Sequence, residues 1–535
     1  MKGKIEKYEI VCFIISILFF IAGIGMWTAF WPIFNSELKS NYKLEGNIDG
    51  SLKYAAFLYA NPPMKNVMKF NFFNVTNPDE VKYFGAKPEL IEVGGYGFLE
   101  SEKKKYYDFS KDKTKMFYQN YKKYEYSPEN SDEGCNYDDQ LMFPNSIATG
   151  AVATIFLPDS EFSETAQMIV SIGLVVMGEY PFIAKPMRDV LFEGFDDPLL
   201  DIAHSPLFII LANLLGYGDQ LHYIPEMKKF AYMSGYNNTY DENYWINTGY
   251  KDFSKLGHVE NWAGLDKLPF WPTESANQIV GSDSGSLAQI HLTQSDELPF
   301  FLSFMCRSFK KTYWKEEMVD GIKTMAFAVP HEDFDTTLEE NSGFRYKNKE
   351  NVDYFPDWNT CDGSTNSSCV QKTSNGTYLL PPGMFPLVCY PGHNAQPPFT
   401  VIVSPPHFLY SPPEVQRHLS GMNPDPEKHK PMVYYTEKVS GTALQVDVRF
   451  QVNLPMINNK ISIMTSQLPN VLVPLFYEDS HAVVDDFIMN TVWMGVIIVP
   501  RIIEYLKFVL IFIGICILTV VLVIRVRVKG TVSIV

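Results

Sequence analysis

Two long apolar segments, one near each end, constrain this chain more than any other feature. Residues 10–31 read IVCFIISILFFIAGIGMWTAFW, 22 residues without a charge. At about 1.5 Å per residue, a helix of that length crosses a hydrocarbon layer about 30 Å thick. Residues 508–524, FVLIFIGICILTVVLVI, form a shorter run that the residues before it can extend. We therefore predict transmembrane helices at 10–31 and 501–524.

The first segment has an alternative interpretation as a cleaved signal peptide. Ala22, Gly23 and Gly25 are small enough for a cleavage region. The apolar run, however, continues past them to Trp27 and Trp31, which suit a membrane interface. We therefore favour a signal anchor.

Basic residues beyond the outer ends of both segments predict the orientation. Three lysines precede the first segment, and Arg525, Arg527 and Lys529 follow the second. By the positive-inside rule both tails, 1–9 and 525–535, are cytoplasmic, and residues 32–500 form one extracellular or luminal domain. Arg501 and Lys507 on the inner flank oppose this orientation.

Cysteines and glycosylation sequences support the same orientation. Residues 361–389 contain three cysteines, which in an oxidising compartment are typical of a disulfide framework. Disulfides and N-glycans both form on the non-cytoplasmic side. The predicted acceptor sites are Asn74, Asn237, Asn366 and Asn375.

The region between the spans is predicted to be mainly β with helical insertions. Residues 444–454 alternate strictly between apolar and polar, which is typical of a strand with one buried face. Ten prolines between Pro381 and Pro413 exclude a regular helix there but allow short strands such as 399–404. The formal net charge of -16 argues against a nucleic-acid partner.

Helical signals concentrate between residues 145 and 216. The runs MIVSIGLVVM (168–177) and LFIILANLL (207–215) are too short to span a bilayer. One interpretation is a pair of core helices, and the other is an apolar surface for a hydrophobic ligand.

Catalytic signals are weak, and we predict neither an enzyme nor a bound metal or cofactor. The stretch GSDSGS (281–286) lacks the glycine pattern and the partner motifs of a serine nucleophile. It is interpreted as a Gly/Ser turn. The ten histidines form no cluster at metal-ligand spacing.

Several stretches together resemble the class B scavenger receptor family. That family includes the fatty-acid translocase, the high-density-lipoprotein receptor, a lysosomal integral membrane protein and the sensory neuron membrane proteins. The matching stretches are FNVTNPDEV (73–81), EVGGYGF (92–98), RDVLFEGFDDPLL (188–200), INTGYKDFSKLGHVENWAGLDKLPFW (246–271), CRS (306–308), SPPHFLYSPPEV (404–415), SGMNPDPEKH (420–429) and RFQVNLPM (449–456).

The resemblance implies a large antiparallel β-barrel ectodomain with a helical apex at 145–216 and an internal hydrophobic tunnel. It also implies two disulfides, Cys306 with Cys389 and Cys361 with Cys369. The ligand-capturing lysine of the fatty-acid translocase falls on Val176, so that charge is missing here. The candidate ligand-binding residues at the apex are Met168, Ile169, Ile172, Val175 and Val176.

The implied function is a cell-surface receptor that binds lipids at its apex and passes lipid through the tunnel to the membrane bilayer. The expected cargo is fatty acids, sterols or their esters, phospholipids, or lipoprotein particles. The alternative is a lysosomal or endosomal carrier that releases a luminal hydrolase on acidification. The C-terminal tail lacks an acidic dileucine signal, which favours the plasma membrane, and its end, Ser533, Ile534 and Val535, suggests a PDZ partner.

Charge at the predicted apex bears on ligand choice. Only Lys185 and Arg188 offset eight acidic residues between 145 and 200. This excess predicts poor binding of anionic particles and a preference for neutral cargo. The eight are Asp159, Glu161, Glu164, Glu179, Asp189, Glu193, Asp196 and Asp197.

Overall fold

The computed structural model describes residues 2–157, 160, 162–214, 216–218, 227–358, 372–390, 392–397 and 399–532. The chain divides into two compact units. One unit combines the two ends of the chain, Met1–Lys43 and Asp485–Val535, and the other is Leu44–Val484. The predicted Cys361–Cys369 disulfide, the acceptor site Asn366 and the C-terminal Ser533, Ile534 and Val535 lie outside the described residues.

The terminal unit consists of helices. Two of them are long and apolar enough to cross a membrane. They extend beyond the predicted spans 10–31 and 501–524, because polar flanks such as residues 35–42 are helical as well. The helices are α1 (Lys2–Tyr42), α9 (Asp486–Val492), a π-helical segment (Trp493–Ile498) and α10 (Val499–Val532).

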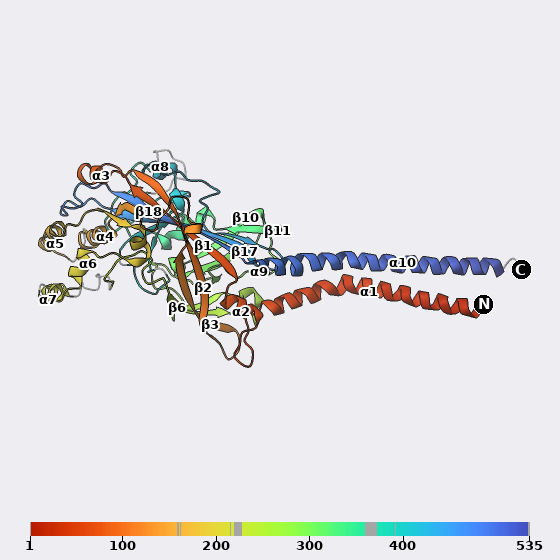
Figure 1. Ribbon diagram of the computed structural model, residues 1–535. Helices are drawn as coiled ribbons and strands as arrows, with labels where there is room; N and C mark the ends of the chain where they lie inside the picture. The colour runs from red at the N-terminus through yellow and green to blue at the C-terminus, as the bar shows by residue number, and fades with distance from the viewer. Residues whose placement is uncertain are drawn as a thin grey trace. The chain divides into compact units, whose positions relative to one another are not determined.

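Small residues bring α1 and α10 together (Figure 1). The hydroxyl of Ser16 donates a hydrogen bond to the Gly514 carbonyl at 2.8 Å. A Cβ on Gly23 would lie only 2.6 Å from the side chain of Ile511. Close backbone approach at small residues is typical of paired membrane helices.

The second unit is built on a 14-stranded sheet. Its pairs are antiparallel except for β8 and β9, which are parallel, so the sheet is mixed and not purely antiparallel as predicted. In spatial order the strands are β7 (Val259–Trp262), β6 (Thr239–Asn247), β3 (Lys115–Tyr126), β2 (Leu90–Phe109), β1 (Met64–Val75), β18 (Val471–Val484), β17 (Ala443–Met456), β16 (Val433–Thr436), β11 (Ile322–Ala328), β10 (Arg307–Val319), β9 (Leu298–Leu302) and β8 (Ser282–Asp283), with β14 (Phe385–Leu387) and β15 (Val401–Ser404) joined at β17.

The two ends of this sheet meet, which confirms the predicted barrel-like fold. The Val259 N–H donates to the Gly281 carbonyl at 2.8 Å, next to a β-bridge between His258 and Ser282. The Tyr118 hydroxyl on β3 donates to Asp283 on β8 at 2.5 Å. Because β3 and β8 are not neighbouring strands, the face that carries Tyr118 points into the interior. Closure leaves few free strand edges.

Strand β17 confirms the clearest strand prediction but not its single buried face. Gln451 and Asn453, on the face predicted to be polar, are fully buried. The Asn453 amide donates to the Ile402 carbonyl at 3.0 Å, and the His407 N–H donates to Gln451 at 2.7 Å. The segment around β15 covers this face, and alternation within β17 cannot reveal that cover.

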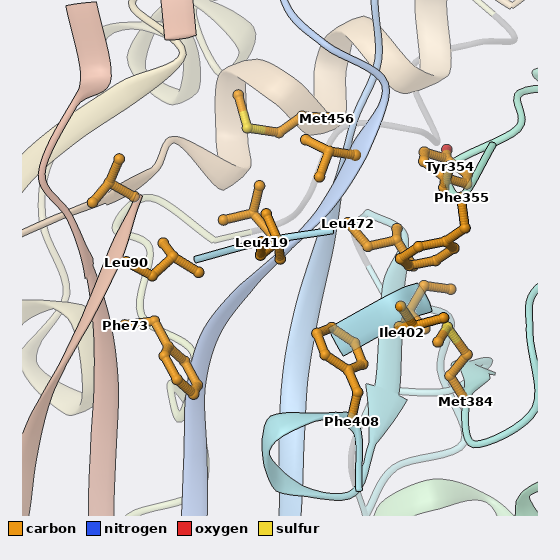
Figure 2. Packing of buried hydrophobic residues seen from close by; sticks show 14 of the residues in the cluster. Phe73, Leu90, Tyr354, Phe355, Met384, Ile402, Phe408, Leu419, Met456 and Leu472 are labelled. Atoms are coloured by element: carbon orange, nitrogen blue, oxygen red, sulfur yellow. The ribbon is translucent and has the colours of Figure 1, made fainter. Parts of the chain in front are cut away.

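A large hydrophobic cluster holds β1, β15, β17 and β18 against residues 354–358, 380–384 and 408–422 (Figure 2). Its members are buried and come from parts of the chain that are far apart in sequence. They include Phe73, Leu90, Tyr354, Phe355, Met384, Ile402, Phe408, Leu419, Met456 and Leu472.

The predicted apex is helical in large part, and its helices gather at one end of the unit (Figure 1). It contains α4 (Ser146–Ile155), α5 (Glu164–Val176), a π-helical segment (Asp189–Glu193), α6 (Pro198–Ala203) and α7 (Pro206–Leu214). The segment also contains a strand that the sequence did not indicate, β5 (Phe182–Pro186), which pairs with β4 (Gln140–Pro144) outside the segment.

Short elements complete the described fold. The strands β12 (Thr373–Ser374) and β13 (Thr377–Tyr378) form a small hairpin. The short helices are α2 (Tyr54–Ala60), α3 (Pro78–Phe84) and α8 (Pro413–Gln416), with 3-10 turns at Pro128–Asn130, Phe253–Lys255, Ser303–Met305, His331–Phe334, Glu339–Phe344 and Pro406–Phe408.

Candidate functional site

Helix α5 begins and ends at clear capping residues. The side chain of Ser163 accepts a hydrogen bond from the Ala166 N–H at 3.3 Å, and Glu164 occupies the first turn. Both features favour a helix N-terminus. Gly178, with φ of +80°, follows the last turn in the left-handed conformation that ends many helices.

One face of α5 packs into the protein. Leu174 is fully buried against Val152, Phe156 and Met464. The Ser171 hydroxyl accepts a hydrogen bond from the Ile463 N–H at 2.8 Å. These contacts attach α5 to α4 and to the loop before β18, so its backbone has a defined position.

The other face of α5 is exposed and apolar. Its five candidate side chains have exposed fractions between 45% and 80%. The interpretation as plain core is therefore wrong for these residues and correct for Leu174. We call this surface the α5 face: Met168, Ile169, Ile172, Val175 and Val176.

Helix α7 exposes a second apolar surface. Leu207, Ile210 and Leu214 are all more than half exposed, at 67%, 56% and 77%. The rings of Phe162, just before α5, and Tyr217, just after α7, stack with centroids 5.2 Å apart. This contact connects the start of α5 to the end of α7.

Several acidic residues around these helices form ion pairs with nearby cations. Asp159 and Glu161 lie outside the described residues. Arg188 forms ion pairs with Asp138, Asp189 and Glu193, and Lys229 pairs with Asp196 at 3.3 Å. Arg188 was already counted among the cations of residues 145–200, whereas Lys229 adds one from outside that range. The preference for neutral cargo stays a prediction.

Glu179 and Asp197 form a buried acid pair between α5 and α6. Only 6% and 4% of their respective surfaces are exposed, and the Asn145 amide donates to Glu179 at 2.9 Å. Burial raises the pKa of Glu179 to about 7, and the nearby Asp197 raises it further in the same direction. Near neutral pH the pair therefore carries less negative charge than two free carboxylates would.

This pair predicts a pH-dependent stability. The pKa of Glu179 is higher in the folded chain than its ordinary value of 4.5. The protonated side chain therefore stabilises the folded state fully below about pH 4.5, and this stabilisation is lost as the pH rises through about 7. We expect thermal unfolding to show a smaller loss between about pH 5.5 and pH 8.5 in Glu179→Gln than in the wild type. The exposed Glu164→Gln is the matched control, and an equal loss in Glu179→Gln and the wild type would contradict the assignment.

A second candidate site is an apolar cavity of about 60 Å³ on the inner side of β17 and β18. By volume it holds about four water molecules. Among the described residues that line it, only Glu478 carries an ionisable carboxyl. The lining residues are Phe230, Ala231, Tyr232, Met233, Phe304, Leu387, Tyr390, Pro397, Phe399, Val401, Val403, Phe450, Val452, Phe476 and Glu478.

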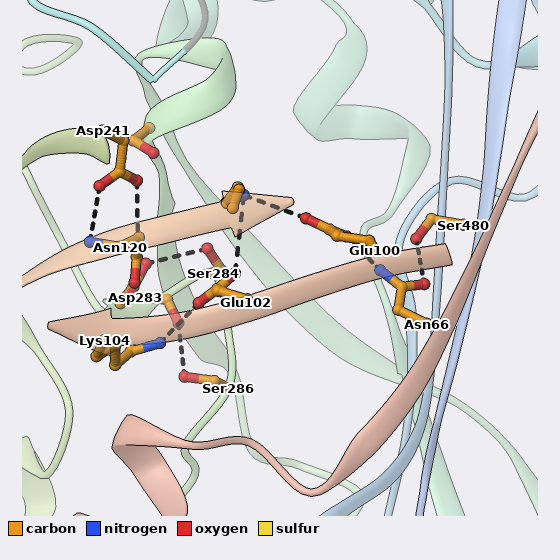
Figure 3. Close-up of polar contacts among 12 residues, drawn as sticks. Asn66, Glu100, Glu102, Lys104, Asn120, Asp241, Asp283, Ser284, Ser286 and Ser480 are labelled. Carbon is orange, nitrogen blue, oxygen red and sulfur yellow. Dashed lines mark hydrogen bonds and ion pairs between the residues drawn. The ribbon is translucent and has the colours of Figure 1, made fainter. Parts of the chain in front are cut away.

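A buried polar cluster occupies another part of the interior (Figure 3). Lys104 donates to Glu102 at 2.7 Å, and Asp241 accepts from the Asn120 N–H and amide at 3.0 and 3.1 Å. Burial acts to raise the pKa of Glu102, but Lys104 and Lys122 overcome it and lower that pKa to about 2. Burial raises the pKa of Asp241 to about 8. These groups stabilise one another, as buried polar networks do.

The GSDSGS stretch forms β8 and a turn, as the sequence indicated. The Ser284 hydroxyl donates directly to Asp283 at 3.0 Å, and Asp283 also accepts from Tyr59 at 3.3 Å. Ser284 therefore has a carboxylate partner in place of the imidazole that activates a catalytic serine.

Cys306 and Cys389 form a disulfide and are completely buried. Among the predicted acceptor sites, Asn375 is exposed. Asn74 accepts a hydrogen bond from the Met142 N–H at 2.8 Å, and the Asn237 amide donates to the Tyr124 carbonyl at 3.1 Å. Glycosylation of these asparagines stays a prediction.

Sequence reasoning missed Glu478 and the acid pair. Glu478 and Asp479 follow the run VLVPLFY and look like the polar end of a strand. Glu179 and Asp197 are 18 positions apart and resemble ordinary surface acids. No local pattern marks these carboxyls as buried, because their burial depends on segments remote in sequence.

Comparisons with known proteins agree with this fold. A family model described as the CD36 family matches residues 14–525. Uncharacterized protein R07B1.3 of Caenorhabditis elegans is 76% identical, over 99% of this chain and 100% of its own length. Scavenger receptor class B member 1 of Rattus norvegicus is 25% identical, over 84% of this chain and 77% of its own. Sensory neuron membrane protein 1 of Manduca sexta is 25% identical, over 91% and 85%.

These relatives carry the resemblance seen in the sequence from end to end. The family match includes most of both apolar terminal helices and the whole barrel-like sheet. The chain therefore belongs to the CD36 family.

Proposed function

We propose that this protein is a plasma-membrane receptor of the class B scavenger type. It binds lipids or lipid-bearing particles through the α5 face and passes lipid through its interior to the membrane. The observation that carries the proposal is the α5 face itself, five adjacent apolar side chains left exposed on a helix whose other side is buried. Exposed apolar patches of this kind are typical of binding surfaces.

The α5 face suits a neutral, apolar cargo. Complete burial of one Val, Leu or Ile side chain contributes about 1.5–3 kcal/mol. Partly exposed side chains contribute less each, but five of them together supply useful binding energy. Because Leu174 and Ser171 attach the helix to the fold, little ordering of the backbone opposes binding.

The interior cavity supports lipid uptake. Its lining is almost wholly aromatic and aliphatic, and each buried methylene of an acyl chain contributes about 0.8 kcal/mol. The relatives named scavenger receptor class B member 1 are receptors by name. Fatty acids, sterols, their esters and phospholipids all have an apolar part, and a cavity of about 60 Å³ takes a short section of it.

A matched pair of substitutions on α5 tests the proposal. Ile172→Asp places a charge on the exposed face and is expected to lower uptake of neutral-lipid particles about tenfold or more, because that charge would lose its water on binding. Its thermal stability should equal that of the wild type, since Ile172 is 50% exposed. Uptake is measured in cells with a fluorescent sterol ester in protein-free emulsion particles, normalised to surface expression.

The control is Leu174→Ala on the opposite face. Leu174 is fully buried, so this variant is expected to lose about 2–5 kcal/mol of stability. Unchanged normalised uptake in Ile172→Asp would contradict the proposed binding surface. So would a loss of stability in Ile172→Asp as large as that in Leu174→Ala.

A further inference from the structure

Glu478 lies among apolar side chains on the inner face of β18. In the sheet register it is directly opposite Phe450 on β17 and Phe70 on β1. Directly opposite residues in antiparallel strands share a face. Phe476, two positions earlier, lines the same cavity. The carboxyl thus reaches the apolar cavity from its wall, and only 4% of the residue is exposed.

The carboxyl of Glu478 has no hydrogen-bond or ion-pair partner among the residues that the structure describes. Glu100 on β2, an acidic residue that raises the pKa of Glu478, differs because its carboxylate has partners. Glu100 accepts from Tyr124 at 3.2 Å and lies 3.6 Å from the Lys122 ammonium. A buried polar group without a partner is costly. Because Glu478 lines the cavity, a group inside the cavity can satisfy its carboxyl, either water or the hydroxyl of a ligand.

The charge around Glu478 narrows the choice of ligand group. Burial raises the pKa of Glu478 to about 8, Glu100 and Asp479 act in the same direction, and Lys122 opposes them. At neutral pH the group is therefore mainly a neutral acid, with one O–H donor and a free acceptor oxygen. It can donate to and accept from a hydroxyl at the same time.

Charged headgroups fit this place less well. A fatty-acid carboxylate would add a negative charge where Glu100 and Asp479 already disfavour one. An ammonium headgroup would require Glu478 to ionise, and an ion pair in an apolar cavity carries the desolvation cost of both charges. A hydroxyl carries neither cost.

We propose that Glu478 selects the headgroup in the interior cavity and that the preferred ligand is a lipid with an uncharged hydroxyl, a long-chain alcohol or a sterol. This inference rests on the proposed uptake of lipid into the interior. It adds a chemical preference that neither the α5 face nor the apolar lining supplies. A ligand that leaves a buried polar group without a hydrogen-bond partner is expected to bind about tenfold or more weakly than one that satisfies the group.

Photoreactive lipids test the preference in the full-length chain in nanodiscs. Hexadecanol, palmitic acid and hexadecylamine each carry a diazirine at the same chain carbon, and a diazirine-bearing cholesterol represents the sterols. Mass spectrometry measures labelling of peptides that contain Phe399–Val403 and Phe450–Val452. At about pH 6.5 the wild type should be labelled about tenfold more by hexadecanol than by palmitic acid. Cholesterol should share this preference if its ring system fits.

Three substitutions sharpen the result. Glu478→Leu removes both hydrogen-bonding atoms and should abolish the preference for hexadecanol over palmitic acid. Glu478→Gln keeps a donor and an acceptor and should retain the preference.

The wild type should lose the preference for hexadecanol over palmitic acid at about pH 9.5, where the carboxyl of Glu478 ionises, whereas Glu478→Gln should keep it. Glu316→Gln, at an exposed ion pair on β10, should match the wild type, and thermal unfolding verifies that each variant is folded.

The outcomes separate this inference from the proposed function. Equal labelling by hexadecanol and palmitic acid, a preference for hexadecylamine, or an unchanged preference in Glu478→Leu would each overturn the role of Glu478 while still supporting lipid uptake. Absence of labelling in the cavity by every probe would overturn both proposals. A tenfold preference for hexadecanol that Glu478→Leu abolishes and Glu478→Gln keeps would support both.

Discussion

Replacing Cys306 and Cys389 together by alanine is expected to lower the free energy of unfolding by about 4–5 kcal/mol at about 25 °C. Their disulfide joins residues 83 positions apart, so its loss frees a long loop in the unfolded chain. In the folded chain it connects the start of β10 to the segment after β14, and the Trp271 indole donates to the Cys306 carbonyl at 2.8 Å beside it. Chemical denaturation of the full-length protein in detergent under non-reducing conditions measures the change.

The matched control is Cys135→Ala. Cys135 is a half-buried free cysteine whose thiol donates to the Gly94 carbonyl at 3.0 Å, so its replacement should cost about 1 kcal/mol or less. Equal stability of the double alanine variant and the wild type would contradict the expected role of the disulfide. Non-reducing peptide mapping should recover Cys306 linked to Cys389.

Gly281→Ala is expected to destabilise the barrel by about 3 kcal/mol or more. Gly281 lies at the seam where the two ends of the sheet meet, and its carbonyl accepts from the Val259 N–H at 2.8 Å. Its φ is +90°, and a Cβ there would lie 2.0 Å from the Pro299 carbonyl oxygen. Since Pro299 lies in β9 and the sheet holds its backbone, the clash can be relieved only by moving Gly281 away from β9, which disturbs the pairing of β8 beside the seam.

Gly264→Ala is the control that distinguishes the cost of the clash from the cost of the left-handed backbone conformation. Gly264 has a similar φ of +78°, but no atom lies within 4 Å of the position that a Cβ would take. This control should therefore cost about 1–2 kcal/mol, the usual penalty for a left-handed conformation. Thermal unfolding of both variants measures the difference, and equal losses would show that the seam adapts to the extra atom.

Local patterns in the sequence predicted those elements whose conformation depends mainly on residues close together in the chain. The apolar runs at 10–31 and 508–524 predicted α1 and α10, because length and composition alone make a segment able to span. The alternation at 444–454 predicted β17. The resemblance to the class B scavenger receptor family predicted the barrel and the Cys306–Cys389 disulfide. No local pattern in the sequence indicates either of them.

The same patterns predicted burial less well, because burial depends on what packs against an element. Ile172 and Leu174 are two positions apart in one apolar run of α5, yet Leu174 is fully buried and Ile172 is 50% exposed. Only the position of α4 and the loop at 461–464 distinguishes them. Strand β5 went unpredicted for a similar reason, since its pairing partner β4 lies outside the segment that looked helical.

The sequence by itself determined where this chain has terminal apolar helices, where its clearest strand runs and which side chains are apolar. Tertiary structure decided which of those side chains remain exposed as the α5 face and which carboxyls lose their water. The residues next to Glu478 in the sequence do not mark it as buried. In the sheet it lies opposite Phe70 and Phe450, which come from strands far from it in the sequence. The spacing of apolar residues along the sequence indicates the local conformation of the chain. Desolvation of a carboxyl and the resulting shift of its pKa arise instead from contacts between residues remote in sequence.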